Sequence, residues 1–285
     1  MSMVRYSIVD VFTDRPFTGN PLAIVHDAEP LAGEQMQAIA REFNLSETIF
    51  VLPPSNPAAT YRVRIFTPGT ELPFAGHPSV GCAVTLLREG AVKGPDVVQE
   101  CGAGLIPIHI DEEHASATVT GGEPTVGAAL DHLPLLAAIG LTEADYAGPA
   151  PRMAGCGLEF AYLSVTDEAV SRLRPGGLVD NLSVFHWDAE RHEAHVRVLV
   201  PEVGVAEDPA TGSAALGLGV WLVSSGLLPG DGRSEYTIRQ GQEMHRPSLL
   251  RCTVSASGGE AVSATVAGHV VSIASGEMVV PPFVG

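Results

Sequence analysis

The sequence is poor in positive charge: 16 lysine and arginine residues stand against 33 aspartate and glutamate residues, a net charge of −17 at pH 7. Proteins bind nucleic-acid phosphates and anionic lipid surfaces through clustered basic side chains. We therefore expect neither nucleic acid nor a membrane among the partners. A local anion site is still compatible with this charge, because glycine amides and helix N-termini carry no formal charge.

Cysteine is scarce as well, with four residues in the chain and no C-x-x-C motif. Scattered cysteines argue against a disulfide framework and against a zinc site, and they are typical of reduced thiols in a cytoplasm. No apolar run reaches the length of a membrane span. The first residues pass directly into the strand-like run Tyr6–Val9 rather than into a signal-like segment. Together these features predict a cytoplasmic protein.

Motifs that hold cofactors or activate nucleophiles are also missing. There is no G-x-G-x-x-G or P-loop sequence, no G-x-S-x-G elbow, and no lysine near the motifs described below that could anchor pyridoxal phosphate. His192-Glu193-Ala194-His195 is one residue short of the zinc motif H-E-x-x-H. The sequence therefore predicts a site that works without a metal or a cofactor.

An internal repeat is the main positive feature of the sequence. The run Val63–Pro68 is echoed by Val196–Pro201. Downstream of each run, six residues recur at a constant offset: Glu71, Pro73, Gly76, Gly81, Leu86 and Gly90 match Glu207, Pro209, Gly212, Gly217, Leu222 and Gly226. A repeat of this length indicates two similar domains.

Each copy of the repeat predicts a strand, a turn and an apolar helix, with many short strand-like runs around it. We expect an α+β fold of two pseudo-symmetric domains, each a β-roll or barrel wrapped around a central helix. The expected domains are residues 1–123 and 124–285, with roughly the last ten residues returning to the first domain. Further expected elements are helices at Glu34–Phe43 and about Pro78–Arg88, and separate strands at Val262–Val266 and Val270–Ala274.

Both copies place glycine at the start of a helix, where backbone N–H groups have no intrahelical partner and attract anions. If the copies face each other, the two helix ends form a site for a small molecule that carries a carboxylate. Pro78 fits the first helical turn, which leaves Gly76 and His77 just outside the helix. The alternative is an ordinary helix start with a solvent-facing histidine.

The second copy places Asp208, Gly212 and Ser213 where the first has its glycine and histidine. These residues present a carboxylate, an amide and a hydroxyl, which suits a polar ligand better than either helix start alone. The alternative for Asp208 is a helix-capping role near the N-terminus.

Glu47 is the candidate for acid–base chemistry, because it stands between a loop and a strand-like run of apolar residues. Burial at such a place favours the neutral form of a carboxyl group and therefore a proton shuttle near neutral pH. The alternative is a capping box, for which Asn44 and Glu47 have the right spacing. The β-branched run Thr48–Leu52 directly afterwards is poor helix sequence, which weakens that alternative.

These segments resemble the PhzF-like proteins of phenazine biosynthesis, within the diaminopimelate-epimerase-like superfamily. The resemblance covers essentially the whole chain, and its markers are specific only in combination. The markers are Val9–Phe12, Gly19–Pro21, Asn44–Thr48, Phe66–Pro68, Glu71–Pro78, Glu207–Ala214, Gln240–Gly241 and Arg246–Ser248.

The resemblance implies a metal-free and cofactor-free isomerase of secondary metabolism, usually a homodimer, which acts on a cyclic dienyl amino acid such as trans-2,3-dihydro-3-hydroxyanthranilate. Glu47 would shuttle the proton, and His77 and Asp208 would hydrogen-bond the substrate's polar groups. The remaining implied positions contact the substrate and its carboxylate: Asn20, Gly76, Gly212 and Ser213.

Two facing thiols would instead signal an amino-acid epimerase, but the helix starts hold no cysteine, and Cys82 lies too far into its helix. His245 departs from the family pattern, which often has glycine there, and we expect it to affect cleft shape or dimer packing. Two other functions stay open from the sequence: an isomerase of a pyrroline-carboxylate diene, and a non-catalytic member that binds a small amino acid.

Overall fold

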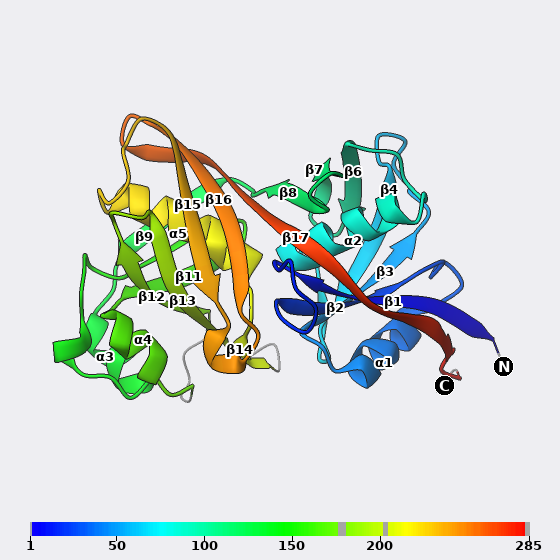
Figure 1. Cartoon of the computed structure of the whole chain (residues 1–285), viewed down its shortest axis with the longest axis horizontal. Helices are drawn as coiled ribbons and strands as arrows, with labels where there is room; N and C mark the ends of the chain where they lie inside the picture. The colour runs from blue at the N-terminus through cyan, green and yellow to red at the C-terminus, as the bar shows by residue number, and fades with distance from the viewer. Residues whose placement is uncertain (1, 176–180, 202–204, 283–285) are drawn as a thin grey trace. The chain divides into compact units, whose positions relative to one another are not determined.

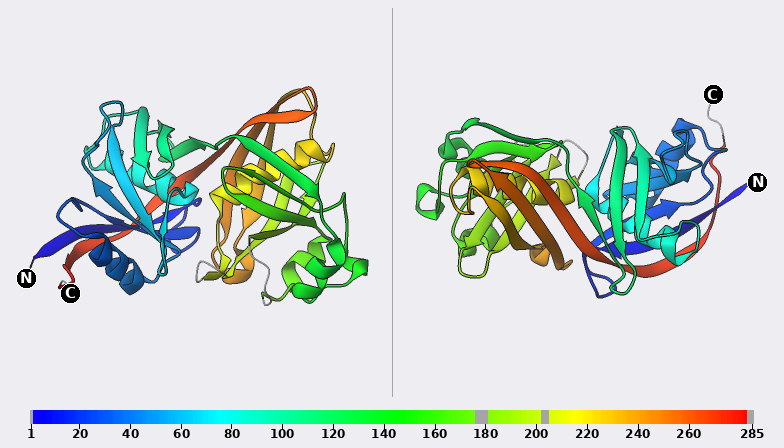
Figure 2. Two further views of the ribbon diagram at one scale, coloured as in Figure 1. Left: turned by 180° about the vertical axis from the view of Figure 1, so that it is seen from behind. Right: turned by 90° about the horizontal axis from the view of Figure 1, so that it is seen from above.

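The computed structural model describes residues 2–175, 181–201 and 205–282. The chain divides into two units, Met1–Val119 with Ala267–Gly285, and Thr120–Val266. The boundary after Val119 lies slightly before the expected boundary at residue 123. The chain returns to the first unit at Ala267, well before the last ~10 residues that we expect to return. The cause is β17 (Glu260–Val279), a continuous strand whose second half pairs with β1 (Met3–Val11). Figures 1 and 2 show the blue β1 beside the red end of β17.

The first unit is a closed ring of strands around one helix (Figure 1). Besides β1 and β17 its elements are β2 (Asn20–Val25), α1 (Gly33–Phe43), β3 (Glu47–Leu52), β4 (Tyr61–Phe66), β5 (Glu71–Leu72), α2 (Gly76–Arg88), β6 (Asp96–Cys101), β7 (Gly104–Asp111) and β8 (Ser116–Thr120). The ring runs β1–β2–β3–β4–β6–β7–β8–β17 and returns to β1, with β2–β3 and β4–β6 parallel. The helix α2 packs against β1, β2, β3 and β7 and is buried from Gly76 to Leu86.

The second unit repeats this order of strands. Its elements are β9 (Pro124–Ala129), α3 (His132–Ala138), η1 (Glu143–Asp145), β10 (Arg152–Cys156), β11 (Glu159–Ser164), α4 (Asp167–Arg172), β12 (Leu182–Asp188), β13 (Glu193–Val200), β14 (Val205–Asp208), α5 (Gly212–Ser224), β15 (Gly232–Gln240), η3 (Gln242–Met244) and β16 (Ser248–Ser257). Strands β10 to β16 pair as β1 to β7 do, with β11–β12 and β13–β15 parallel. The central helix is α5, so the expected fold of two similar barrels is confirmed.

The glycine within each central helix lets the helix approach the strands around it. A Cβ atom at Gly81 would lie 2.6 Å from Leu22 Cδ2 and 2.8 Å from Val11 Cγ2. A Cβ atom at Gly217 would overlap the Tyr162 hydroxyl and lie 3.0 Å from a backbone Cα atom. The repeat therefore keeps glycine where α2 and α5 touch their barrel walls, since any side chain would push the helix away.

A second pair of matching glycines ends the two helices. Gly90 has a φ of +71° and Gly226 a φ of +72°. Their N–H groups donate to the carbonyl oxygens of Leu87 and Val223 over 2.9 and 3.0 Å. A left-handed residue after the last helical turn is strongly favoured to be glycine, which explains why this position recurs in the sequence.

An arginine and a glutamate conserved between the two copies form the same forked ion pair in each unit. Arg64 donates to Glu71 over 2.7 and 2.6 Å, and Arg197 donates to Glu207 over 2.7 and 2.7 Å. The first pair is 35% and 42% exposed, whereas the second is 6% and 8% exposed. Arg197 also donates to two backbone carbonyls, which compensates part of the cost of burying its charge.

Two expected elements differ from the observed ones. The helix α2 begins at Gly76 rather than at about Pro78, so His77 lies within its first turn. The two strands expected around Gly268 are parts of the single strand β17. A Cβ atom at Gly268 would overlap the Phe12 ring. This glycine therefore serves a close approach of Phe12 rather than a turn, which is why the break predicted from the sequence is absent.

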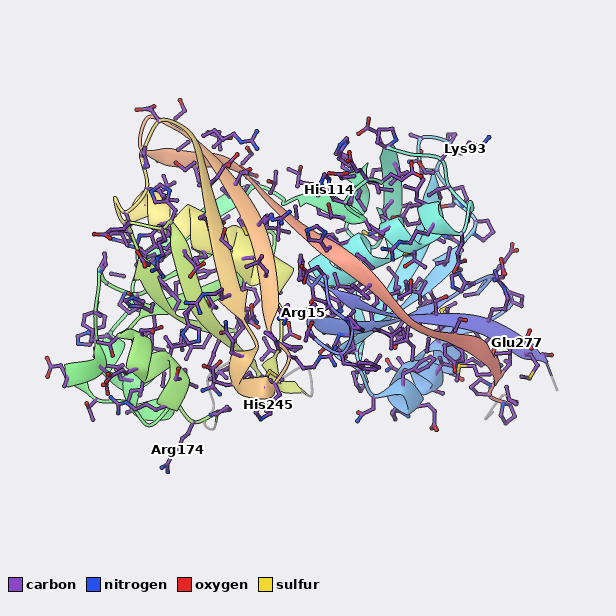
Figure 3. The ribbon with its side chains drawn as sticks, in the orientation of Figure 1. Arg15, Lys93, His114, Arg174, His245 and Glu277 are labelled. Carbon is purple, nitrogen blue, oxygen red and sulfur yellow. The ribbon has the colours of Figure 1, made fainter. Side chains whose placement is uncertain are left out.

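His245 follows η3, at one end of β15 and β16 (Figure 3). Its φ is +57°, in the left-handed region that glycine adopts without strain. This geometry gives a physical reason for glycine at such a position and shows that histidine is accommodated here in the same conformation. The cost of a non-glycine residue in this region is about 1 kcal/mol.

Candidate active site

Three candidate residues of the first unit come together from three elements. Asn20 is the first residue of β2 and Glu47 the first residue of β3, and these strands are parallel neighbours with Leu22 opposite Glu47. His77 is the second residue of α2. Because neighbouring parallel strands begin at the same edge of a sheet, the first two side chains start close together, and the helix brings the third to them.

The capping-box alternative for Glu47 is wrong. Asn44 does not begin a helix but ends α1, with φ 50° and ψ 37° in the left-handed region. Asparagine tolerates this conformation better than most residues and is often found after the last helical turn. Three residues later the chain enters β3, so Glu47 is a strand residue that lies beside the start of α2.

The resulting cluster is buried. His77 Nδ1 lies 3.4 Å from Glu47 Oε2 and 3.3 Å from Asn20 Nδ2. The side chain of His77 is 3% exposed and that of Glu47 is 16% exposed, so the alternative of a solvent-facing histidine is wrong. Among the residues that the structure describes, none hydrogen-bonds the buried Nε2 of His77. Leaving such an atom without water or a ligand costs about 1–3 kcal/mol.

Burial lowers the pKa of His77 to about 3, against the opposing effect of a hydrogen bond with the backbone of Pro21. The imidazole is therefore neutral at neutral pH, and its contact with Glu47 is not a full ion pair. A neutral imidazole carries one N–H donor and one lone pair, so it can receive a hydrogen bond at one nitrogen and give one at the other.

Asp208 is the centre of a second cluster, in the second unit. It ends β14, is 7% exposed, and accepts a hydrogen bond at Oδ2 from Thr211 Oγ1 over 2.6 Å. Gln240 Nε2 donates to the Asp208 carbonyl oxygen over 2.7 Å and to Thr211 Oγ1 over 3.0 Å. Gln240 Oε1 accepts from the Thr211 N–H over 3.2 Å. These bonds hold both the backbone and the carboxylate of Asp208 in place.

The remaining candidates lie at the starts of the two central helices. Gly76 and Gly212 are the first residues of α2 and α5, and Ser213 is the second residue of α5. The N-cap residues Ala75 and Thr211 give neither helix a side-chain capping bond. Asp208 lies three residues before the N-cap Thr211 and accepts a hydrogen bond from its hydroxyl. Amides at such helix starts are suited to an anion.

The structure thus brings the candidates together in two sets, one in each unit. In the first unit His77 contacts both Asn20 and Glu47, and in the second Asp208 lies four residues before Gly212, the first residue of α5. Reasoning from the sequence missed the part that Gln240 plays. Gln240 and Gly241 are among the markers of the family resemblance, but only the fold shows that the Gln240 amide bonds the strand that carries Asp208.

The thiols are in environments unsuited to proton transfer. Cys82 in α2 is buried, and burial raises the pKa of its thiol; burial likewise raises the pKa of Cys156 to about 12. Within the described parts of the chain, no group of three or more histidine, cysteine, aspartate or glutamate side chains is arranged to hold a metal ion. None of the helices there is long and apolar enough to cross a membrane.

Two similar barrels, each closed around a helix, define the epimerase-like class of folds. A hydroxyproline epimerase from Agrobacterium vitis superimposes with a TM-score of 0.67 at 14% identity, over 96% of this chain and 92% of its own. A PhzF family protein from Bacillus anthracis superimposes with a TM-score of 0.87 at 27% identity, over 98% and 100%.

Sequence comparison gives the family. The model of the phenazine biosynthesis-like protein family matches residues 9–276. An uncharacterized isomerase of Mesorhizobium japonicum is 36% identical over 98% of this chain and 99% of its own length. A trans-2,3-dihydro-3-hydroxyanthranilate isomerase of Pseudomonas aeruginosa is 35% identical over 96% and 99%. The chain belongs to the phenazine biosynthesis-like (PhzF) family and is an isomerase of that family.

Proposed function

We propose that this isomerase moves a proton on a cyclic, conjugated amino acid without a cofactor, and that Glu47 is its acid–base group. The observation that carries the proposal is the buried contact between the Glu47 carboxyl group and the neutral imidazole of His77. A carboxyl group positioned beside a polar partner and largely shielded from water suits proton transfer to and from carbon.

In the proposed reaction the Glu47 carboxylate takes a proton from one ring carbon of the substrate. The electron pair of that C–H bond joins the conjugated system, and the carboxylic acid then returns the proton to another carbon of the same system. The product contains the same atoms as the substrate, so the step consumes no oxidant or reductant. Such acid–base catalysis contributes about 10²- to 10⁴-fold to the rate.

His77 would hydrogen-bond the substrate. Its Nδ1 faces Glu47 Oε2 and Asn20 Nδ2, and its ring is bonded to the backbone of Pro21, so Nδ1 is already engaged within the protein. Nε2 is the buried atom for which the described residues supply no partner, and it would bond the substrate. Asn20, 3.3 Å from Nδ1, would fix the plane of the ring.

The second cluster offers polar groups for substrate binding. We propose that the amides at Gly76 and Gly212 and the hydroxyl of Ser213 are substrate-binding groups, because each helix start favours an anion. Asp208 would accept a hydrogen bond from a substrate hydroxyl or ammonium group. Its orientation is already set by Thr211, which reduces the entropy lost on binding.

The first substrate to test is trans-2,3-dihydro-3-hydroxyanthranilate, since a relative at 35% identity over nearly its full length is named for this reaction. A relative at 36% identity is named only as an isomerase, so the family supports the reaction class more strongly than the substrate. A pyrroline-carboxylate diene would fit the same proton shuttle and is the second compound to test.

The decisive experiment is Glu47→Gln, which keeps the shape of the side chain but cannot shuttle a proton. Turnover, followed by the ultraviolet spectrum of the conjugated substrate, should fall by about 10²- to 10⁴-fold. Binding of the substrate by calorimetry should change by only a few-fold. In D2O the wild-type protein should introduce deuterium into the product, and Glu47→Gln should introduce almost none.

Glu89→Gln is the matched control. Glu89 Oε2 lies 3.6 Å from Nδ1 of the buried His26 and forms a second histidine–carboxyl contact of the first unit. Its replacement should leave turnover within a few-fold of wild type.

Full turnover in Glu47→Gln would refute the assigned role. If the wild-type protein binds but does not convert dihydrohydroxyanthranilate, the proposed substrate is wrong, and the pyrroline diene becomes the compound to test.

A further inference from the structure

His195 on β13 belongs to neither cluster, and a carboxylate approaches each of its ring nitrogens. Nδ1 lies 2.8 Å from Asp167 Oδ1, at the start of α4, and Nε2 lies 3.1 Å from Glu243 Oε1, in η3. The His195 side chain is 7% exposed and that of Glu243 is 16% exposed. Ionised carboxylates only accept hydrogen bonds, so a ring that satisfies both must carry a proton on each nitrogen.

The electrostatics of the cluster favour this imidazolium form. Burial lowers the pKa of His195, but the hydrogen bonds with Glu243 and Asp167 outweigh it, and the pKa is raised overall. The hydrogen bond with His195 in turn lowers the pKa of Asp167. Together with the lowered pKa of Glu243, these shifts favour an imidazolium at His195 between two carboxylates.

The other charged groups near the cluster come from the neighbouring strands. His186 lies directly opposite His195 on β12, and Arg239 lies opposite it on β15. Arg239 is paired with Glu193 over 2.6 Å. Arg197 also acts on Glu243 through its charge. The positive charges of Arg239 and Arg197 act on the carboxyl groups of Asp167 and Glu243, respectively.

Glu243 lies three residues after Gln240, the residue that hydrogen-bonds Asp208. Gln240, the last residue of β15, bonds Asp208 and Thr211 directly. Gly241 follows with a φ of +79°, and a Cβ atom there would lie 2.6 Å from the Pro209 carbonyl oxygen. The turn from β15 into η3 therefore lies against the backbone that follows Asp208, and a displacement of η3 would be transmitted to it.

We propose that His195 is a positioning residue: as an imidazolium it ties η3 to β13 and α4, and thereby keeps Gln240 on Asp208 and Thr211. The inference rests on the proposed role of Asp208 in substrate binding. When the ring loses a proton, one of its two hydrogen bonds is lost, and the nearly buried Glu243 carboxylate can face a lone pair. Substrate binding should then weaken as the pH rises.

The first test measures the position of η3 directly, by hydrogen exchange of the backbone amides of residues 240–244 in the full-length protein. In His195→Gln and in Glu243→Gln the protection of these amides at pH 7 should fall about tenfold, the effect of losing one charge-assisted hydrogen bond. Asp167→Asn is the matched control, because it alters the other bond of the same ring and leaves the link to η3 intact. In Asp167→Asn the loss of protection should begin at a lower pH than in the wild-type protein, because one of the two carboxylates that favour the imidazolium is gone.

The second test uses kinetics. In the wild-type protein kcat/KM should decline at alkaline pH, chiefly through a rising KM. His195→Gln should be about tenfold lower in kcat/KM at pH 7 and should lack this alkaline decline. Protection of residues 240–244 equal to wild type in His195→Gln, or an unchanged alkaline decline, would overturn the inference. If Asp208→Asn retains full turnover, the proposed function fails at that residue, while hydrogen exchange still decides whether His195 holds η3.

Discussion

The low pKa of His77 predicts a specific loss of stability in acid. The ordinary pKa of a histidine is 6.5, and burial lowers that of His77 to about 3 in the folded protein. Between these values only the unfolded chain binds the proton. Each pH unit in that window removes about 1.4 kcal/mol from the free energy of unfolding, or about 5 kcal/mol over the whole range. The contribution is fully present above pH 6.5 and is lost as the pH falls.

His77→Gln removes this titration and isolates it by difference. The variant should be less stable than wild type at pH 7.5, because a buried ring is lost. Between pH 6.5 and pH 5, however, the wild-type protein should lose about 2 kcal/mol more than the variant does. Burial lowers the pKa of His26 as well, so the wild-type curve contains both effects, and only the difference between the two proteins reports His77.

Urea unfolding at several pH values should be followed by a signal from the first unit. Trp187 and Trp221 both lie in the second unit, so their fluorescence does not report on His77. Hydrogen exchange of the buried amides of α2 is suitable, because α2 lies in the first unit. His109→Gln, at an exposed position, serves as the control. A difference between wild type and His77→Gln that stays constant from pH 7.5 to pH 5 would refute the reasoning.

Three further predictions concern stability and are measured by urea unfolding at pH 7. Arg197→Met leaves the buried Glu207 carboxylate without its ion-pair partner and should lower the free energy of unfolding by about 3–5 kcal/mol. Arg64→Met breaks the matching, more exposed pair and should cost less than about 1 kcal/mol; equal losses would contradict the assigned burial. Gly217→Ala should cost about 1–3 kcal/mol through overlap with Tyr162, and an unchanged stability would show that the helix can shift. His245→Gly places glycine in the left-handed region and should change the free energy of unfolding by less than about 1 kcal/mol. A larger loss would show that the His245 side chain makes a stabilising contact.

Much of the fold could be predicted because its main sequence pattern occurs twice in the chain. The matching glycines predicted two helices of the same kind, and the observed α2 and α5 begin and end at matching positions. Met36, Ile39 and Ala40, whose spacing is that of one helix face, pack into a single apolar cluster. Short-range patterns sufficed here, because each element has a clear amphipathic or apolar signature.

What could not be predicted depends on contacts between distant segments. Gly268 looks like a break in a strand, yet it lies within β17, where its lack of a side chain admits Phe12. The bond from Gln240 to Asp208 joins residues 32 positions apart. The hydrogen bonds of His195 with Asp167 and Glu243 join the helix α4, the strand β13 and the short 3₁₀ helix η3. Sequence spacing carries no information on such pairs without the strand order.

The two copies have kept their scaffold and diverged in electrostatics. In the first unit the forked arginine–glutamate pair is partly exposed and the start of α2 carries a neutral, buried imidazole beside a carboxyl group. In the second unit the same pair is buried and the start of α5 follows a carboxylate held by Thr211. A neutral, deeply buried partner suits a group that gains and loses a proton, whereas a carboxylate held by hydrogen bonds suits a fixed charge. The divergence therefore falls on the residues proposed for proton exchange and for substrate binding, whereas the scaffold around them is shared.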